Sequence, residues 1–178
     1  MKRQKLTNMC LSLCLSLFCF CSSMVAKAEG GLQGGSVYRI LSVPYAKAVT
    51  NGDNGEAGAA IKLAAVNKNS KGQEWMLYAV DETKGVYSLL NTEYAQAVDM
   101  VLQGDGVLLQ WHFEPKNVNQ QILIQAVEGL DNTYRLLNAS SALKAVTAQE
   151  DGSLKMQDNL SSEATHFSLE KLHSSVTV

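Results

Sequence analysis

The side chains that most often carry out catalysis are few in this sequence, and their spacing forms no catalytic group. The three histidines, His112, His166 and His173, stand singly. There is no H-E-x-x-H pair, which would hold zinc on one face of a helix, and no G-x-S-x-G turn to expose a serine nucleophile. Acid pairs such as Asp81-Glu82 fall in predicted turns, and glycosidase chemistry needs two acids that face each other across a cleft. The sequence therefore predicts a protein that is not an enzyme and that carries no metal or cofactor.

The first 28 residues are typical of a secretory signal. Basic residues at positions 2, 3 and 5 precede an uncharged apolar stretch over 9–20, which is too short to span a bilayer comfortably. Small residues at Ala26 and Ala28 predict cleavage before Glu29, which would leave a domain of residues 29–178 in the periplasm or outside the cell. A lipoprotein anchor at Cys19 or Cys21 is the weaker alternative, because phenylalanine precedes each of them where a lipoprotein peptidase prefers small residues.

Removal of this segment changes both the cysteine content and the charge. All four cysteines lie within it, so the domain that remains could form no disulfide. It would keep 11 Lys and Arg against 17 Asp and Glu, a formal charge of −6. An acidic surface gains nothing from counterion release, so we expect no nucleic-acid partner and no stable membrane insertion. A neutral ligand fits this composition better.

The elements that position any site come from a pattern that occurs three times. Each copy opens with an alternating run led by tyrosine, and the runs begin 49 and then 47 residues apart. Three further alternating runs follow in each copy, separated by turn formers such as Asn51-Gly52 and Asp151-Gly152, which leaves no room for long helices. We therefore predict an all-β domain of three four-strand units over about 36–82, 83–130 and 131–172, with 173–178 as a loose tail.

The third run of each unit can be aligned by its alternation. It reads Ile61-Lys62-Leu63, Leu109-Gln110-Trp111 and Leu154-Lys155-Met156 in the three units. In this alignment Trp111 is the counterpart of Leu63 and Met156, so packing in the core is one interpretation of its ring. Gln110 should then point to the opposite side of the strand from Leu109 and Trp111.

The last run of each unit carries a resemblance to a known family. Gln73-Glu74-Trp75, Gln120-Gln121-Ile122 and, in a degenerate form, Thr165-His166-Phe167 resemble the Q-x-W signature of the ricin B-type lectins. The resemblance covers nearly the whole of 29–178, and it implies a β-trefoil. The signature itself has a structural reading, in which the apolar residue fills the core and the glutamine binds neighbouring backbone groups.

The resemblance also implies one carbohydrate site, in the middle unit. Asp99 falls on the family's aspartate position, Trp111 on its aromatic position, Asn119 on its asparagine position and Gln120 on the signature glutamine. An aspartate can accept two sugar hydroxyls, an asparagine can both donate and accept, and an indole can pack against the C–H face of a sugar ring. The polar counterparts of Asp99, Thr50 and Thr147, indicate a solvent-facing position.

Two departures keep other functions open. Leu109 stands where these lectins often carry a sugar-contacting glutamine, and the aligned Trp111 could be core. The preferred interpretation is an exported, lectin-like module with one weak galactose-type site that binds a neutral carbohydrate or glycan. The alternative is a protein-binding β-trefoil, acting as a protease inhibitor or assembly module, whose sugar sites have degenerated.

Overall fold

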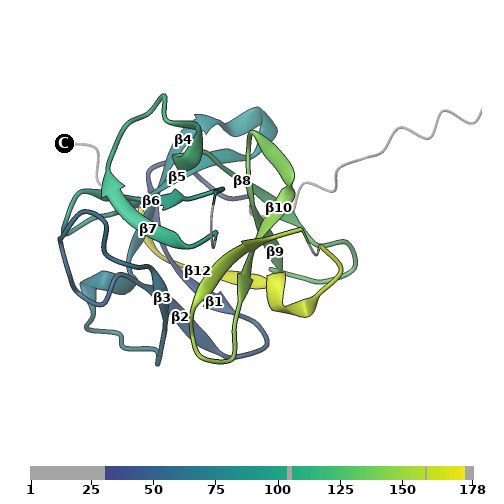
Figure 1. Ribbon diagram of the computed structural model, residues 1–178, viewed down its shortest axis with the longest axis horizontal. Helices are drawn as coiled ribbons and strands as arrows, with labels where there is room; N and C mark the ends of the chain where they lie inside the picture. The colour runs from purple at the N-terminus through teal and green to yellow at the C-terminus, as the bar shows by residue number, and fades with distance from the viewer. Residues whose placement is uncertain (1–30, 104–105, 159, 175–178) are drawn as a thin grey trace, which may run out of the picture.

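The computed structural model describes residues 31–103, 106–158 and 160–174, so the predicted signal segment lies outside the described residues. Within them the chain is built from twelve strands and four single-turn 3-10 helices, which confirms the all-β prediction (Figure 1). The strands are β1 Ser36–Ser42, β2 Lys47–Thr50, β3 Lys62–Ala64, β4 Trp75–Asp81, β5 Val86–Asn91, β6 Gln96–Met100, β7 Leu108–His112, β8 Ile122–Ala126, β9 Tyr134–Asn138, β10 Ser141–Ala148, β11 Leu154–Gln157 and β12 Phe167–Ser174.

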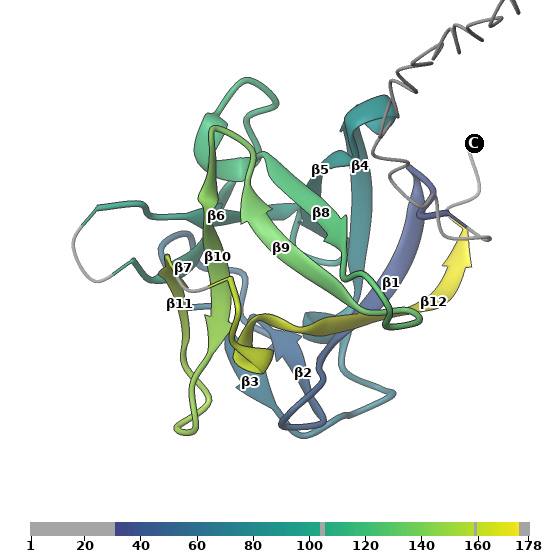
Figure 2. The same cartoon turned by 90° about the vertical axis from the view of Figure 1, so that its right-hand side faces the viewer.

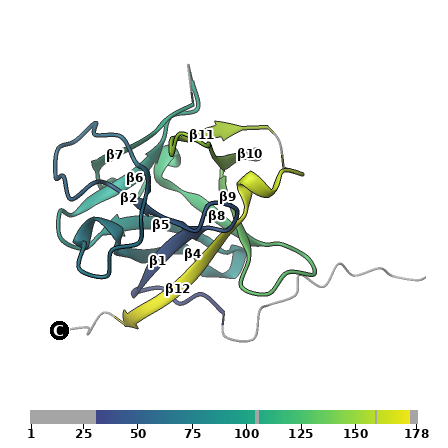
Figure 3. The same cartoon turned by 90° about the horizontal axis from the view of Figure 1, so that it is seen from below.

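The first and fourth strands of each unit close a barrel. β1 pairs with β4 within its unit and with β12 across the closure, and β4 continues the ring to β5. The ring is completed through β8 and β9, which pairs with β12. Figure 3 shows β12 running beside β1 where the first and last described strands meet. Full closure leaves no barrel strand with an open edge.

The second and third strands of each unit form hairpins that gather over one end of the barrel (Figure 2). Three single bridges join the hairpins into a triangle: Ala60 to Leu109, Lys62 to Ser153, and Val107 to Lys155. Each hairpin is therefore bonded to the other two, and the three units share one cap. This arrangement is a β-trefoil, as predicted.

The core lies where barrel and cap meet, and its residues come in sets of three. The apolar residues of the three signatures, Trp75, Ile122 and Phe167, are fully buried at its centre. Nε1 of the Trp75 indole donates to the Val49 carbonyl at 3.0 Å, so its one polar atom is satisfied. The signature position thus fills the core in all three units, including the degenerate third.

Strand register corrects the alignment of the third strands. Val49 faces Leu63, Val98 faces Gln110, and Val146 faces Met156. The counterpart of Leu63 and Met156 is therefore Gln110, one residue earlier than the sequence alignment placed it. The counterparts of Trp111 are Ala64 and Gln157, which lie on the outer face of their hairpins. The predicted equivalence of Trp111 with core residues was wrong by one position.

The end of the third unit also differs from the prediction. The segment 173–178 was expected to be a loose tail, but β12 continues through Ser174, and residues 175–178 lie outside the described residues. His173 pairs with Val37 and Ser174 with Ser36, after a bulge between Val37 and Tyr38. The strand extends because β1 offers it a partner over its whole length.

Candidate functional site

The four residues predicted for the site come from β6, β7 and the 3-10 helix η3, Val118–Gln120. Asp99 lies on the outer face of β6, opposite Leu109. It is only 8% exposed, and its counterparts Thr50 and Thr147 are also buried, so the expectation that this position faces solvent was wrong. The position is outward but covered by the chain that follows the hairpin.

The Asp99 carboxylate is held from one side. Its Oδ2 accepts a hydrogen bond from Nδ2 of Asn117 at 3.2 Å and from Nε2 of Gln120 at 3.3 Å. No described residue donates to Oδ1. Nor does Oδ1 belong to the fully buried side-chain atoms that have no hydrogen-bond partner. Two amides therefore orient the carboxylate and leave its second oxygen to accept from a ligand.

Gln120 supports this carboxylate and ties down backbone. It is fully buried, its Nε2 donates to the His112 carbonyl at 2.9 Å, and its Oε1 accepts from the Glu114 amide at 2.9 Å. Gln73 makes the same pair of bonds in the first unit, to Ala65 and Asn67. This is the backbone tie that the signature predicted, and only in the middle unit does it also reach an aspartate.

Trp111 is the exposed part of the site. Trp111 is 42% exposed on the outer face of β7, and its cross-strand partner is Ala97. The ring borders the backbone of Gly58, where an added Cβ would lie 3.3 Å from ring atom Cζ3. Gly58 has φ +85°, a conformation that L side chains rarely adopt, so both its conformation and the neighbouring ring favour glycine. The site thus includes a loop from the first unit.

That loop is fixed by Gln110, a residue for which the sequence suggested no role. Gln110 is fully buried, and its Nε2 donates to the carbonyls of Asn54 at 2.6 Å and Glu56 at 2.7 Å. Its Oε1 accepts from Nδ2 of Asn51 at 3.0 Å. Backbone bonds between Gln110 and the Gly58-Ala59 segment run alongside. A polar residue at a position occupied by Leu63 and Met156 was the available signal, but the shifted alignment concealed it.

Asn119 lies in η3, at the edge of the same group. Its backbone amide donates to Oδ1 of Asn117, which caps the helix, while its own side chain is partly exposed and has no partner among the described residues. Asn117 is the second residue that sequence reasoning missed. Its place before the 3-10 turn, where the other units carry Ser70 and Ser162, marks it as a cap residue.

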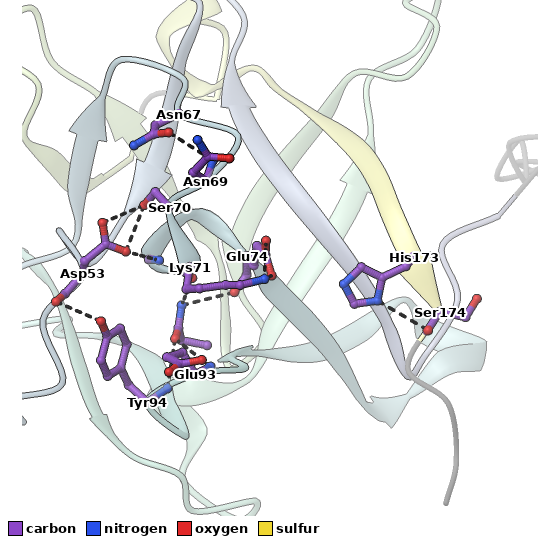
Figure 4. Close-up of polar contacts among 12 residues, drawn as sticks. Asp53, Asn67, Asn69, Ser70, Lys71, Glu74, Glu93, Tyr94, His173 and Ser174 are labelled. Atoms are coloured by element: carbon purple, nitrogen blue, oxygen red, sulfur yellow. Dashed lines mark hydrogen bonds and ion pairs between the residues drawn. The ribbon is translucent and has the colours of Figure 1, made fainter.

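The corresponding region of the first unit contains a carboxylate that is already occupied. Both oxygens of Asp53 accept from the Ser70 hydroxyl, and Oδ1 also accepts from the Gly72 amide at 2.6 Å (Figure 4). Tyr94, from the middle unit, donates its hydroxyl to the Asp53 carbonyl at 3.0 Å. This group fastens the first unit to the second. In the third unit Gln157 stands in place of Trp111.

Other titratable groups lie away from this site. The pKa of Asp81 is lowered to about 2, first by its hydrogen bonds with Lys84 and Thr83 in a surface turn. Burial lowers the pKa of His166, with a smaller contribution from the nearby Arg135 cation. The described residues contain no cluster of three or more histidine, cysteine or acidic side chains placed to hold a metal. Among them, too, no helix has the length and apolar character needed to cross a membrane.

Comparisons with known proteins identify the fold. No family model and no curated protein matches this sequence. Among solved structures, the designed three-fold symmetric protein ThreeFoil matches with a TM-score of 0.67 at 18% identity, covering 76% of this chain and 99% of that one. The Macrolepiota procera ricin B-like lectin, solved with lactose, matches with a TM-score of 0.63 at 14% identity, covering 79% and 99%.

The C-half of the earthworm R-type lectin, solved with GalNAc, matches with a TM-score of 0.58 at 16% identity, covering 77% of this chain and 99% of that one. Identities this low show a shared fold. The chain therefore has the β-trefoil architecture that ricin B-like lectins also have.

Proposed function

We propose that this chain is an exported carbohydrate-binding module that holds one galactose-type sugar at Asp99, Trp111 and Asn119 of the middle unit. The observation that carries the proposal is the oriented carboxylate: Asn117 and Gln120 fix Asp99 through Oδ2, and Oδ1 is left to accept a sugar hydroxyl. The exposed Trp111 ring lies on the same face of the hairpin, and the Asn119 amide, which has no partner among the described residues, lies next to Gln120 in η3. A ligand with hydroxyls on one edge and C–H groups on one face requires such groups.

The corrected register supports this proposal. Trp111 is not the equivalent of a core residue, so packing in the core does not account for its presence. Lectin structures of the same fold were solved with lactose and with GalNAc, which favours a galactose-type ligand. Gln120 is fully buried and would act through Asp99 without touching the sugar.

Affinity for a single sugar should be weak. Leu109 occupies the place of a further polar contact, and a shallow polar site gripping a well-hydrated ligand gives a dissociation constant on the order of millimolar, about −4 kcal/mol. Useful avidity would then need repeated ligands on a glycan surface.

The experiment is an NMR titration of the protein expressed as the full chain and purified after export. Its mass should correspond to a chain that starts at Glu29. Galactose, GalNAc and lactose at millimolar concentration should shift the amides of Asp99, Trp111 and Asn119 saturably, and a glucose control should not.

Two variants and a control sharpen the test. Asp99→Thr introduces the residue that both sister units carry at this position, so it should fold and lose binding. Trp111→Ala should also lose binding, whereas Val43→Ala, which truncates an equally exposed apolar side chain in the first unit, should not. Flat titrations with every sugar would refute the proposal and favour the protein-binding alternative.

A further inference from the structure

A groove beside the candidate site is uncharged and largely apolar. It has a volume of about 360 Å³ and lies between the first and middle units. Its lining residues are Met76, Leu90, Asn91, Thr92, Ala95 and Phe113. Every lining side chain is neutral although the protein is acidic overall, which indicates a neutral occupant.

Strand register places this groove on the same outer surface as Trp111. Met76 of β4 faces Leu90 of β5, Leu90 faces Ala97 of β6, and Ala97 faces Trp111 of β7. Paired residues on neighbouring strands point to the same face of a sheet, and strands lie about 4.8 Å apart. The floor of the groove and the Trp111 position are thus about 10 Å apart along one row.

The aromatic residue that lines the groove is Phe113. Phe113 follows Trp111 by two residues and packs edge-on against Tyr78, with ring centroids 4.8 Å apart at 64°. Tyr78 is 39% exposed and does not line the groove itself, but its contact braces the Phe113 ring, which presents an aromatic surface to the groove. Such a surface can stack against the C–H face of a pyranose ring, as the Trp111 ring can.

The polar groups of the groove divide into two kinds. The Asn91 amide is already used: Nδ2 donates to the carbonyls of Lys71 and Glu74, and Oδ1 accepts from two backbone amides of the following turn. Thr92 is exposed, and no described residue bonds to its hydroxyl. A single hydroxyl beside an apolar floor, such as that of Thr92, can fix the orientation of a ring-shaped ligand through one hydrogen bond.

We propose that this groove binds the second sugar residue of a glycan whose terminal galactose-type residue is held at Asp99. The inference rests on the proposed function and extends it: the ligand is an oligosaccharide of at least two neutral rings. Phe113 and Met76 contact the apolar face of the second ring, and Thr92 bonds one of its hydroxyls.

The test compares methyl β-galactoside, lactose and melibiose on the same exported protein by NMR titration. At least one disaccharide should bind about three- to tenfold more tightly than the methyl galactoside, the gain expected from one additional stacked ring. Only the disaccharide should shift the amides of Thr92, Ala95 and Phe113.

Two variants locate the gain. Phe113→Ala should bring the affinity for the disaccharide close to that for methyl β-galactoside and leave the latter unchanged. Thr92→Val keeps the shape of an exposed side chain and removes only the hydroxyl, so it should lower the affinity for the disaccharide alone. Val66→Ala, at an exposed apolar residue of the first unit, is the matched control.

The failures are distinguishable. Equal binding of monosaccharide and disaccharides, unaffected by Phe113→Ala, would overturn the second subsite and leave the proposed function intact. If the wild-type protein binds none of the sugars, both the second subsite and the proposed function are wrong. Phenyl β-galactoside is a further probe: if its phenyl group shifts the Thr92 and Phe113 amides and no disaccharide does, the groove takes apolar groups and the proposal is wrong.

Discussion

Replacing Gln110 with methionine tests whether a buried amide holds the first unit's loop against the middle unit. Methionine is the residue at the equivalent position of the third unit, Met156, and has nearly the same length. The change removes the hydrogen bonds that the side chain makes with Asn51, Asn54 and Glu56.

The magnitude follows from those bonds. Each contributes about 0.5–1.5 kcal/mol net, so three contribute roughly 1.5–4.5 kcal/mol. The more apolar methionine recovers about 1 kcal/mol by being buried. We therefore expect the free energy of unfolding to fall by about 0.5–3.5 kcal/mol, which lowers Tm by about 1–14 °C in a domain of this size.

Urea denaturation gives the free energy, and hydrogen exchange reports on the loop. The backbone amide of Gly58 donates to the Gln110 carbonyl, and that of Gln110 donates to the Ala59 carbonyl. Both amides should exchange faster in Gln110→Met. Gln125→Met makes the same chemical change at an exposed position of β8 and should stay within about 0.5 kcal/mol of the wild type. A Gln110→Met protein as stable as the wild type, with unchanged exchange at Gly58, would show that the amide does not anchor the loop.

Three further predictions concern the rest of the fold. Because burial lowers the pKa of His166 below its ordinary 6.5, the folded state resists protonation there, so the free energy of unfolding should fall as pH drops below 6.5. His166→Gln, which matches the middle unit, should remove that slope in urea melts at pH 5 to 7; a retained slope would assign it to another group. Gly106→Ala should destabilise by more than Gly129→Ala in the same melts, since both have positive φ but only at Gly106 would the added Cβ meet backbone, 2.9 Å from the Met156 carbonyl; equal losses would contradict this. The Asp81 carboxyl should titrate near pH 2 by NMR, and in Lys84→Met its midpoint should move toward 3.8; an unmoved midpoint would exclude the Lys84 contact as the cause.

The fold was predictable from sequence because its signal is repeated. Three tyrosine-led runs and three signature positions each report on the same core, so the degeneracy of Thr165-His166-Phe167 did not obscure the trefoil. The register of the third strands was less secure. An alternating run such as Leu108-Leu109-Gln110-Trp111 contains two apolar residues in succession, so a shift by one position looks equally apolar.

That shift decided what could be inferred about the site. It made Trp111 look like a core residue and hid Gln110 as the polar residue facing a loop from another unit. Asn117 was also missed, because its contact with Asp99 depends on how η3 folds back over β6, which spacing along the chain does not encode. Contacts between units could not be predicted from the sequence. The repeat shows which positions of the three units are equivalent, and it does not show which residues of different units lie side by side.

The pairing of β1 with β12 has a consequence for how the chain could be connected. Ser36 and Ser174 are register partners, so a short linker could join these two positions. The chain could then be opened in the turn between β4 and β5, giving a circular permutant in which the loop 51–60 lies near the C-terminal end and β7 near the N-terminal end. The Gln110 side chain and the Trp111 ring would still contact that loop, because these contacts depend on the closed ring of strands and not on the order in which the strands are synthesised.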